Sequence, residues 1–263
     1  MTKGYVIMAF GDEKYRKCAD TLCRSIHQVM PDSKVSLITD VEYDSNIYDK
    51  ILVVEGVDNT EWKLANDYLV YDHSPYEYTI KLEADMYITR SIDYWWNILE
   101  SRDLNICTTV RDFRGNISTN DYYRKTFTES KLPPTYNAIT YFKKSELAER
   151  FFQLVKDIFE NWSEYVQLLD YSSEDRATTD VVYSIAAKII GVENCTLPTF
   201  TDFSMIHMKR EINGNTTQVW HDEMIYEIHV NVFRINTYPQ MYPIHYHNKA
   251  FAGIIDGELL DDR

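Results

Sequence analysis

The first hundred residues alternate between short, continuous apolar runs and longer segments in which apolar residues recur at helical spacing. A short run that is apolar throughout is typical of a buried strand in a parallel sheet, because helices cover both faces of such a sheet. Strands are expected at residues 5–10, 35–39, 51–54 and from residue 78 onward, and helices at residues 15–29 and 63–71. This alternation predicts an α/β fold with a mostly parallel central sheet flanked by helices.

Residues that favour helix ends mark the limits of these segments. Asp12 follows Gly11 after the first strand and is a good N-cap, because its carboxylate accepts hydrogen bonds from free backbone N–H groups. Pro31 stops the first helix, and Pro75 stops the second. Ligands of open α/β sheets bind beyond the carboxyl ends of the strands, so Gly11 and Asp12 are expected at a binding site.

The remainder of the chain is less regular. A long loop is expected at residues 111–136, where Gly and Pro interrupt the pattern, and an amphipathic helix is expected after the N-cap Ser145. The other expected elements are a helix at residues 178–190 that ends at Gly191, a hairpin turn at residues 213–215 and a half-buried strand at residues 228–232.

The strand that starts at residue 78 ends in two carboxylates, Glu83 and Asp85. Residues i and i+2 of an extended segment point to the same side, so both carboxylates are expected to face one point at the end of the strand. Converging carboxylates are unfavourable unless a cation lies between them or one of them is protonated. A divalent ion that carries a diphosphate meets this requirement, which indicates chemistry on a nucleotide-diphosphate substrate.

The length and composition are those of a globular enzyme. A chain of 263 residues favours one large domain, residues 1–263, or two closely packed halves, residues 1–100 and 101–263. Aromatic residues make up 14% of the chain, and its 21 tyrosines suit a cleft for carbohydrate or nucleotide, because the ring stacks while the hydroxyl forms hydrogen bonds.

The charge and the cysteines restrict the partners and the location. The net charge of −14 disfavours non-specific attachment to nucleic acid or to an anionic membrane, which depends on many Lys or Arg contacts with phosphates. The four cysteines show neither metal-binding spacing nor a disulfide framework. No leader or membrane-spanning run is visible, so a soluble, cytoplasmic protein is expected.

Four other motifs accompany the acidic pair: Ala9-Phe10-Gly11-Asp12, Asn137-Ala138, Thr178-Thr179-Asp180 and Ile244-His245-Tyr246-His247-Asn248-Lys249. Together with Glu83-Ala84-Asp85, they resemble the GT-A glycosyltransferases, most closely the glycogenin and galactosyltransferase-like group that retains anomeric configuration. The resemblance implies a single GT-A domain with a Rossmann-like sheet, whose first half binds the nucleotide and whose second half binds the acceptor. It also implies that Glu83 and Asp85 bind a metal ion, Mn²⁺ or Mg²⁺, as the family's aspartate-any-aspartate motif does.

The resemblance also assigns the remainder of the donor site. It places the base and ribose of a nucleotide-diphosphate sugar at Ala9, Phe10, Asp12 and Tyr15, and a basic residue near the donor at Lys63 or Lys81. In the last motif, His245 or His247 completes the metal site, and Lys249 contacts the diphosphate.

Two further residues are implied to take part in catalysis. Asn137 is expected beside the sugar, and Asp180 is expected close to the reacting carbon, where it would stabilise an oxocarbenium-like centre or orient the acceptor. Glu174 and Asp175 lie just upstream of Asp180. Retention follows from the resemblance alone; inversion would need a carboxylate base, for which Asp180, Asp175 and Asp112 are the candidates.

The acceptor is left open between a glycan and a modified DNA base. The small, acidic, Tyr-rich chain is similar in composition to transferases of large bacterial viruses, which glycosylate hydroxymethylated DNA bases in the host cytoplasm. A DNA acceptor would require base flipping and a basic rim, expected from Arg111, Arg114 and Lys131. The alternatives are a nucleotidyltransferase, whose usual Gly-rich loop is missing after the first strand, and a non-catalytic sugar-binding module on the same fold.

Overall fold

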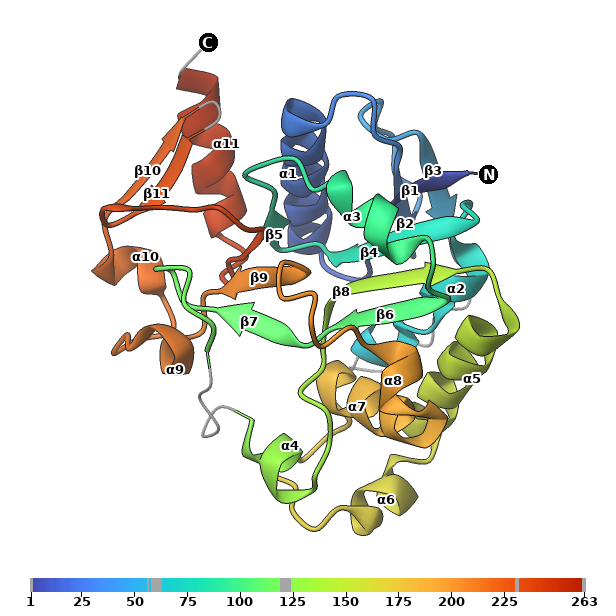
Figure 1. Cartoon of the computed structure of the whole chain (residues 1–263). Helices are drawn as coiled ribbons and strands as arrows, with labels where there is room; N and C mark the ends of the chain where they lie inside the picture. Colours follow the sequence, from blue (N-terminus) through green and yellow to red (C-terminus); the bar gives the residue numbers. More distant parts are fainter. Residues whose placement is uncertain (1, 56, 58–62, 119–123, 230–231, 262–263) are drawn as a thin grey trace.

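A computed structural model describes residues 2–55, 57, 63–118, 124–229 and 232–261 of the chain. Its centre is a six-stranded sheet in the order β3-β2-β1-β4-β8-β6 (Figure 1). The strands are β1 (Lys3–Ala9), β2 (Val35–Thr39), β3 (Lys50–Val53), β4 (Tyr78–Glu83), β6 (Leu104–Cys107) and β8 (Tyr136–Lys143). Strands β1 to β4 run parallel, and β8 is antiparallel to both of its neighbours.

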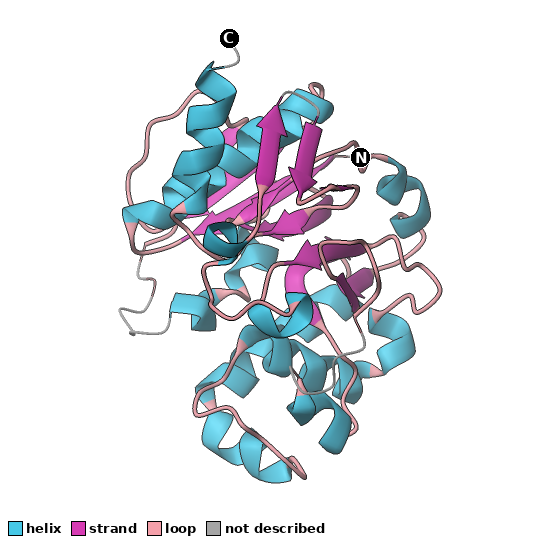
Figure 2. Cartoon of the chain, turned by 90° about the vertical axis from the view of Figure 1, so that its left-hand side faces the viewer, coloured by secondary structure: helices cyan, strands magenta, loops and turns pink. Residues whose placement is uncertain are grey.

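Helices lie on both sides of this sheet, as Figures 1 and 2 show. Tyr5 and Ile7 of β1 belong to one core, and Val6 belongs to the other, because successive side chains of a strand point to opposite faces. A strand that is buried on both faces is apolar throughout, which explains the continuous run in β1. The helices of the first core include α1 (Glu13–Val29) and α3 (Tyr94–Leu99), and those of the second include α2 (Leu69–His73), α5 (Glu146–Glu160) and α7 (Thr179–Ile190).

A second, four-stranded sheet joins segments that are far apart in the sequence. Its order is β5-β13-β9-β7, with β13 antiparallel to β5 and parallel to β9. His245 therefore lies opposite Met86 on one side and His207 on the other, so the end of the chain meets the segment that follows β4. The strands of this sheet are β5 (Met86–Tyr87), β7 (Thr109–Arg111), β9 (Ser204–His207) and β13 (Ile244–His245).

The remaining elements are small. A three-stranded antiparallel sheet packs against α11 (Phe251–Asp261), which also contacts α1. Its strands are β10 (Tyr226–His229), β11 (Val232–Ile235) and β12 (Tyr238–Pro239). The short helices are η1 (Lys63–Asn66), α4 (Lys125–Glu129), α6 (Trp162–Tyr165), η2 (Val166–Leu168), α8 (Val192–Cys195), α9 (Arg210–Asn213) and α10 (Trp220–Glu223).

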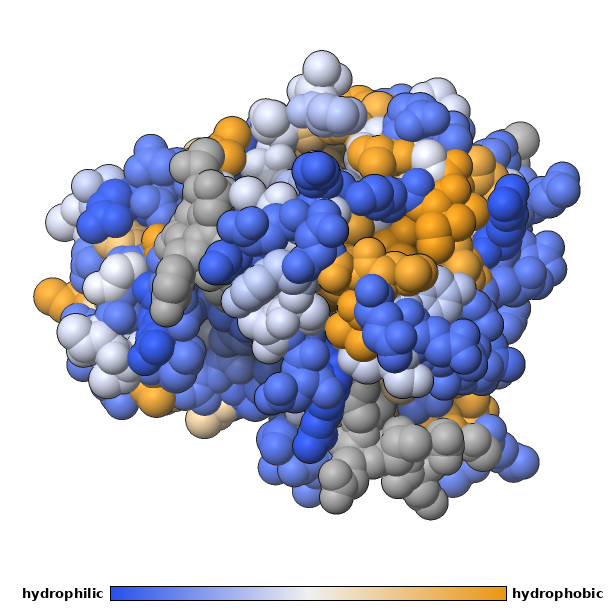
Figure 3. All heavy atoms as spheres, turned by 90° about the horizontal axis from the view of Figure 1, so that it is seen from below, coloured by the Kyte–Doolittle hydropathy of each residue, from blue (hydrophilic) through white to orange (hydrophobic). Residues whose placement is uncertain are grey.

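One face of the molecule is mostly hydrophilic, and its largest group of apolar side chains lies over one part of it (Figure 3). Among the described residues, no helix has both the length and the apolar character needed to cross a bilayer.

The expected fold class is confirmed, because the central sheet is mostly parallel and flanked by helices. Three predicted helix ends are also confirmed. The side chain of Asp12 accepts from the Lys14 N–H at the start of α1, and that of Ser145 accepts from the Ala148 N–H at the start of α5. Gly191 ends α7 with φ at 108°, a value that favours glycine.

Two predictions of regular structure are wrong. The helix expected at residues 63–71 is two pieces, η1 and α2, and between them the side chain of Asp67 turns inward to pair with Lys81. This buried pairing outweighs the local helical pattern. The loop expected at residues 111–136 contains the helix α4, whose Phe127 is buried in the second core.

Two predictions near the end of the chain are also wrong. The turn expected at residues 213–215 is the end of helix α9, where Gly214 adopts φ of 73° and its N–H donates to the Arg210 carbonyl. Asn-Gly favours left-handed backbone in both settings, so the dipeptide does not distinguish a hairpin from a helix end. The strand expected at residues 228–232 is divided between β10 and β11, and residues 230–231 lie outside the described part.

Gly4 of β1 lies against a buried aromatic ring. A Cβ atom at this position would lie 2.5 Å from two carbons of the Tyr76 ring, and the hydroxyl of that ring is hydrogen-bonded to Ser36 Oγ at 2.7 Å. We expect Gly4→Ala to lower the free energy of unfolding by about 1–3 kcal/mol, as overpacking of a core does. Urea denaturation measures this change.

Gly253→Ala in α11 is the matched control. A Cβ atom there meets no atom within 4 Å, and alanine is favoured over glycine in a helix by about 0.5–1 kcal/mol. The free energy of unfolding is expected to stay the same or to rise. Equal losses in the two variants would contradict the steric account of Gly4.

Candidate functional site

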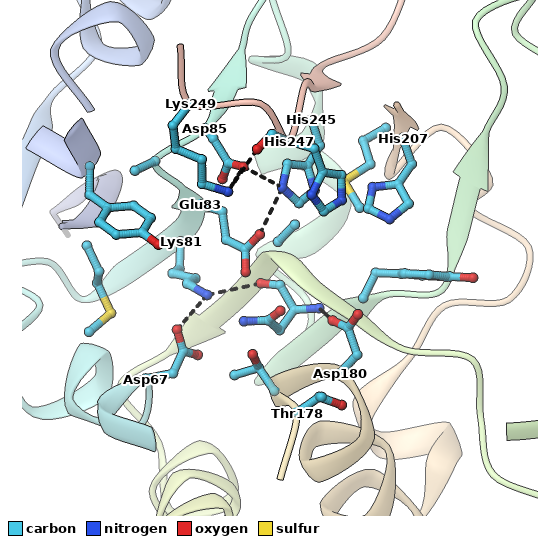
Figure 4. A pocket seen from close by; sticks show the side chains of 18 of the residues that line it. Asp67, Lys81, Glu83, Asp85, Thr178, Asp180, His207, His245, His247 and Lys249 are labelled. Atoms are coloured by element: carbon cyan, nitrogen blue, oxygen red, sulfur yellow. Dashed lines mark hydrogen bonds and ion pairs between the residues drawn. The ribbon is translucent and has the colours of Figure 1, made fainter. Parts of the chain in front are cut away.

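A cavity of about 590 Å³ opens where β1 and β4 end, and it is drawn in Figure 4. This position at the strand ends agrees with that expected for ligands in an open α/β sheet. Residues from both the first and the second half of the chain line the cavity. The residues predicted from the sequence that line it are Phe10, Asp12, Tyr15, Lys81, Glu83, Asp85, Asn137, Asp180, His245, His247 and Lys249.

The two carboxylates at the end of β4 meet cationic side chains from the end of the chain. β13 pairs with β5, which places His245 beside the acidic residues. The Nε2 atom of His245 lies 3.2 Å from Glu83 Oε2 and 3.2 Å from Asp85 Oδ2. Lys249 Nζ donates to Asp85 Oδ2 at 2.7 Å (Figure 4). Glu83 and Asp85 thus face the same point, as their i, i+2 spacing predicts.

Burial and pairing act in opposite directions on these groups. Burial raises the pKa of the Glu83 carboxyl. Burial also opposes ionisation of Asp85, but His245 and Lys249 outweigh it and hold the pKa of Asp85 below its usual range. Burial likewise opposes the charge of His245 and of Lys249, yet Asp85 raises the pKa of both. The carboxylate pair therefore requires positive charge beside it.

The donor atoms of this group fit a divalent metal ion. One atom each from Glu83, Asp85 and His245 lie within 4.8 Å of one another. The Nδ1 atom of His245 is buried and has no hydrogen-bond partner in the described part of the chain. Two carboxylates and one imidazole suit Mn²⁺, and the carboxylates alone suit Mg²⁺.

His207 was not predicted as a site residue, although it lies beside both predicted histidines. Its ring centroid is 4.9 Å from that of His245 and 4.8 Å from that of His247, and the last two rings stack at 4.3 Å. Burial lowers the pKa of His207 and of His247 below the usual range, so both imidazoles are neutral. No local spacing marks His207, because only the pairing of β9 with β13 brings it into the cavity.

His247 has unusual backbone geometry. Its φ of 65° lies in the left-handed region, which costs a non-glycine residue about 1–2 kcal/mol. Such conformations are concentrated at functional sites, where the surrounding structure fixes them. The imidazole of His247, the residue with this conformation, lines the cavity.

A buried ion pair lies beneath the acidic residues. Lys81, two residues before Glu83 on β4, contacts Asp67 Oδ1 at 2.7 Å and donates to the Asn137 carbonyl at 3.2 Å. The Tyr183 hydroxyl donates to the other oxygen of Asp67. This network joins β4, β8 and α7 at the wall of the cavity, and Asp67 carried no sequence signal for such a role.

Asp180 fixes the opposite wall. It lies in the first turn of α7, and its Oδ1 atom accepts from the Asn137 N–H at 2.9 Å. Its Oδ2 atom pairs with Arg124, which also contacts Glu174 Oε1 at 3.5 Å. The Nδ2 atom of Asn137 is buried without a partner among the described residues. Asp180 therefore holds β8 and Arg124 in place. The side-chain amide of Asn137 beside them is available to a ligand.

The first turn supplies the remaining wall of the cavity. The Gly11 N–H donates to both carboxylate oxygens of Asp40, at 2.9 and 3.0 Å, which fixes the turn between β1 and α1. Phe10 and Tyr15 place aromatic rings at the cavity. The Lys249 ammonium lies 5.8 Å from the centroid of the Tyr15 ring, so the turn lies beside the acidic pair.

Other predicted residues are placed differently. Ala9 does not line the cavity: it is 1% exposed, and its side chain packs in the first core, because β1 turns it away from Phe10. Lys63 begins η1, and its side chain lies outside the described part. Asp112 and Asp175 do not line the cavity either.

The predicted basic rim is wrong at Arg111. Its side chain is buried and donates to Ser204 Oγ and to the carbonyls of Gly115 and Thr201. Arg114 and Lys131 do not line the cavity.

Comparison with known proteins gives a likeness of fold. No family model and no curated protein matches the chain. The WbbM bifunctional glycosyltransferase has a TM-score of 0.51 at 10% identity, over 98% of this chain and 52% of that chain. The glycosyltransferase GlyE of Streptococcus pneumoniae TIGR4 has a TM-score of 0.48 at 13% identity, over 75% of this chain and 46% of that chain. The chain therefore shares the fold of the WbbM glycosyltransferase structure. It spans about half the length of both structures.

Removal of one partner of the Lys81–Asp67 pair is expected to destabilise the fold strongly. Both side chains are buried, at 1% and 7% exposure, so Lys81→Met leaves an uncompensated carboxylate in the interior. We expect a loss of about 3–5 kcal/mol in the free energy of unfolding. Lys81→Met combined with Asp67→Leu should lose less, because no charge is left unpaired. Urea denaturation of both variants tests this.

Lys17→Met serves as the matched control. Lys17 pairs with Glu13 at 3.0 Å, but both side chains are 68% exposed, so a change within about 0.5 kcal/mol is expected. A single Lys81→Met variant as stable as this control would rule out the structural role of the buried pair.

Proposed function

We propose that this protein is a metal-dependent glycosyltransferase of the GT-A type that transfers a sugar from a nucleotide-diphosphate sugar to a hydroxyl group. The observation that carries the proposal is the convergence of Glu83, Asp85, His245 and Lys249 at the strand ends of a glycosyltransferase fold. Three of these groups fit a divalent ion, and the fourth is a cation beside it. A diphosphate is a ligand for both the divalent ion and the Lys249 ammonium.

The donor site is assigned to the first turn and the last motif. Phe10 and Tyr15 supply aromatic rings for the base, and Asp12 supplies an acceptor for ribose hydroxyls. Glu83, Asp85 and His245 would hold Mn²⁺ or Mg²⁺, which supplies Lewis acidity to the leaving diphosphate when bound. Lys249, released from Asp85, contributes a further positive charge to the phosphate oxygens.

The transfer exchanges one bond at the anomeric carbon. The bond between that carbon and the diphosphate oxygen breaks, and its electron pair leaves with the nucleoside diphosphate. A hydroxyl oxygen of the acceptor forms the new bond, and its proton passes to the departing phosphate oxygen. Asn137 lies beside the sugar in this arrangement, held by Asp180 through its backbone N–H.

Charge pairing in the cavity supports retention of configuration. Inversion needs a carboxylate that is free to act as a base. Every carboxylate among the described residues that line the cavity is paired with a cationic side chain: Asp12 with Lys14, Asp67 with Lys81, Glu83 and Asp85 with His245, and Asp180 with Arg124.

A glycan hydroxyl is the acceptor that the charges favour. A duplex DNA acceptor needs several cationic side chains for its phosphates. Arg111, expected to be one of them, is buried among backbone carbonyls, and the chain carries a net charge of −14. We therefore propose a glycan as acceptor in preference to a hydroxymethylated base in phage DNA.

A thermal-shift screen tests the donor site. Nucleotide sugars with Mn²⁺ or Mg²⁺ at about 100 times the dissociation constant should raise the melting temperature by about 5–10 °C, because the ligand binds only the folded state. Asp85→Asn should abolish this shift and the release of nucleoside diphosphate. Asp103→Asn, which changes a partly exposed carboxylate paired with Lys143, is the control and should behave as the wild type.

The outcomes separate the alternatives. No metal-dependent shift with any nucleotide sugar would refute the donor site. A shift that Asp85→Asn abolishes, without turnover of the wild-type protein on any glycan, would favour a sugar-binding module instead.

Asp180→Asn tests the opposite wall. The change keeps the size of the side chain and an oxygen that can accept from the Asn137 backbone N–H, but it removes the charge that pairs with Arg124. We expect kcat to fall about 10²-fold, while the melting-temperature shift with donor is kept. Asp157→Asn, on the exposed face of α5, is the control. A variant with the wild-type kcat would show that Asp180 plays no part in turnover.

A further inference from the structure

Three imidazole rings lie together at one end of the cavity, next to the acidic pair (Figure 4). His207 and His245 occupy paired positions on the parallel strands β9 and β13, so their side chains leave the sheet on the same face. His247 follows two residues after His245 and stacks on its ring. Two of the three imidazoles therefore come from paired strands, and the third comes from the segment that follows β13.

The three rings bring their nitrogen atoms close together. One ring nitrogen from each of His207, His245 and His247 lies within 4.8 Å of the other two. His207 is 2% exposed and His245 is 5% exposed. The Nδ1 atom of His245 and the Nε2 atom of His247 are buried without a hydrogen-bond partner among the described residues. Buried nitrogen atoms without partners are unfavourable unless a ligand binds them.

The backbone of His247 supports the same conclusion. Its φ of 65° is a conformation that few non-glycine residues adopt, and it is kept at the position where the third imidazole enters the cavity. A residue that served only to connect β13 with α11 would not require an imidazole there.

The chemistry of the ligands indicates which ion they suit. Imidazole nitrogen favours borderline divalent transition ions such as Co²⁺ and Zn²⁺, whereas Mg²⁺ favours oxygen ligands and keeps much of its water. We propose that His207, His245 and His247 form a three-imidazole site for a borderline divalent transition ion, which shares His245 with the carboxylate pair. The site would thus let the cavity select such an ion over Mg²⁺. Only this selective role rests on the proposed function, because the three rings would bind an ion without any nucleotide sugar.

Titration with Co²⁺ tests the site directly, since Co²⁺ bound to nitrogen ligands absorbs visible light. The chelator-treated full-length protein is titrated with Co²⁺ in the presence of millimolar Mg²⁺, and absorbance and calorimetry report binding. We expect saturable visible bands that Mg²⁺ does not suppress. His207→Gln and His247→Gln should each weaken Co²⁺ binding about 10-fold or more, with a change in the bands.

His229→Gln is the matched control, because His229 is 51% exposed, lies on β10 and does not line the cavity. It should bind Co²⁺ as the wild type does. Circular dichroism shows whether each variant is folded, and His247→Gln decides the matter if His207→Gln is not.

Wild-type Co²⁺ affinity and bands in folded His207→Gln or His247→Gln would overturn the proposal. Failure of nucleotide sugars to bind, with Co²⁺ binding that depends on His207, would overturn the transferase function and leave the metal site standing. The two proposals therefore fail separately.

Discussion

Two carboxylates at the end of a buried strand require positive charge, and the rest of the structure is arranged to supply it. Asp85 is 5% exposed, and Glu83 ends a strand that is paired on both sides. Neither is stable as a charged group in such a place unless cations are near. His245 and Lys249 provide them from the far end of the chain, at 3.2 and 2.7 Å from Asp85.

This requirement explains the second sheet. The strands β5 and β13 are only two residues long, and their pairing fixes where His245 meets the acidic pair. The same sheet brings β9 alongside, which adds His207. At the wall of the cavity, the Lys81–Asp67 pair ties β4 to the segment before α2 and to α7 through Tyr183. The site is thus supported by contacts between parts of the chain that are distant in sequence.

The features that depend on neighbouring residues could be predicted from the sequence. The apolar runs gave the parallel strands, because burial on both faces demands them. Asp12, Ser145 and Gly191 marked helix ends through local hydrogen bonds or backbone conformation. The spacing of Glu83 and Asp85 placed both at the cavity, since a strand alternates its sides.

The features that depend on tertiary contacts could not be predicted from the sequence. His207 enters the site only through the pairing of β9 with β13, and Arg124 and Asp67 only through ion pairs with residues distant in sequence. Ala9 was misplaced because a motif does not show which of its members the strand turns into the core. His245 and Lys249 were expected through a resemblance of motifs.

A crystal structure of the protein with Mn²⁺ and a nucleoside diphosphate, with anomalous diffraction measured at the manganese absorption edge, would locate the metal ion. We expect one anomalous peak within bonding distance of Asp85, Glu83 and His245, with the diphosphate between it and Lys249. A diphosphate bound in the cavity without such a peak, or a peak away from the acidic pair, would contradict this expectation.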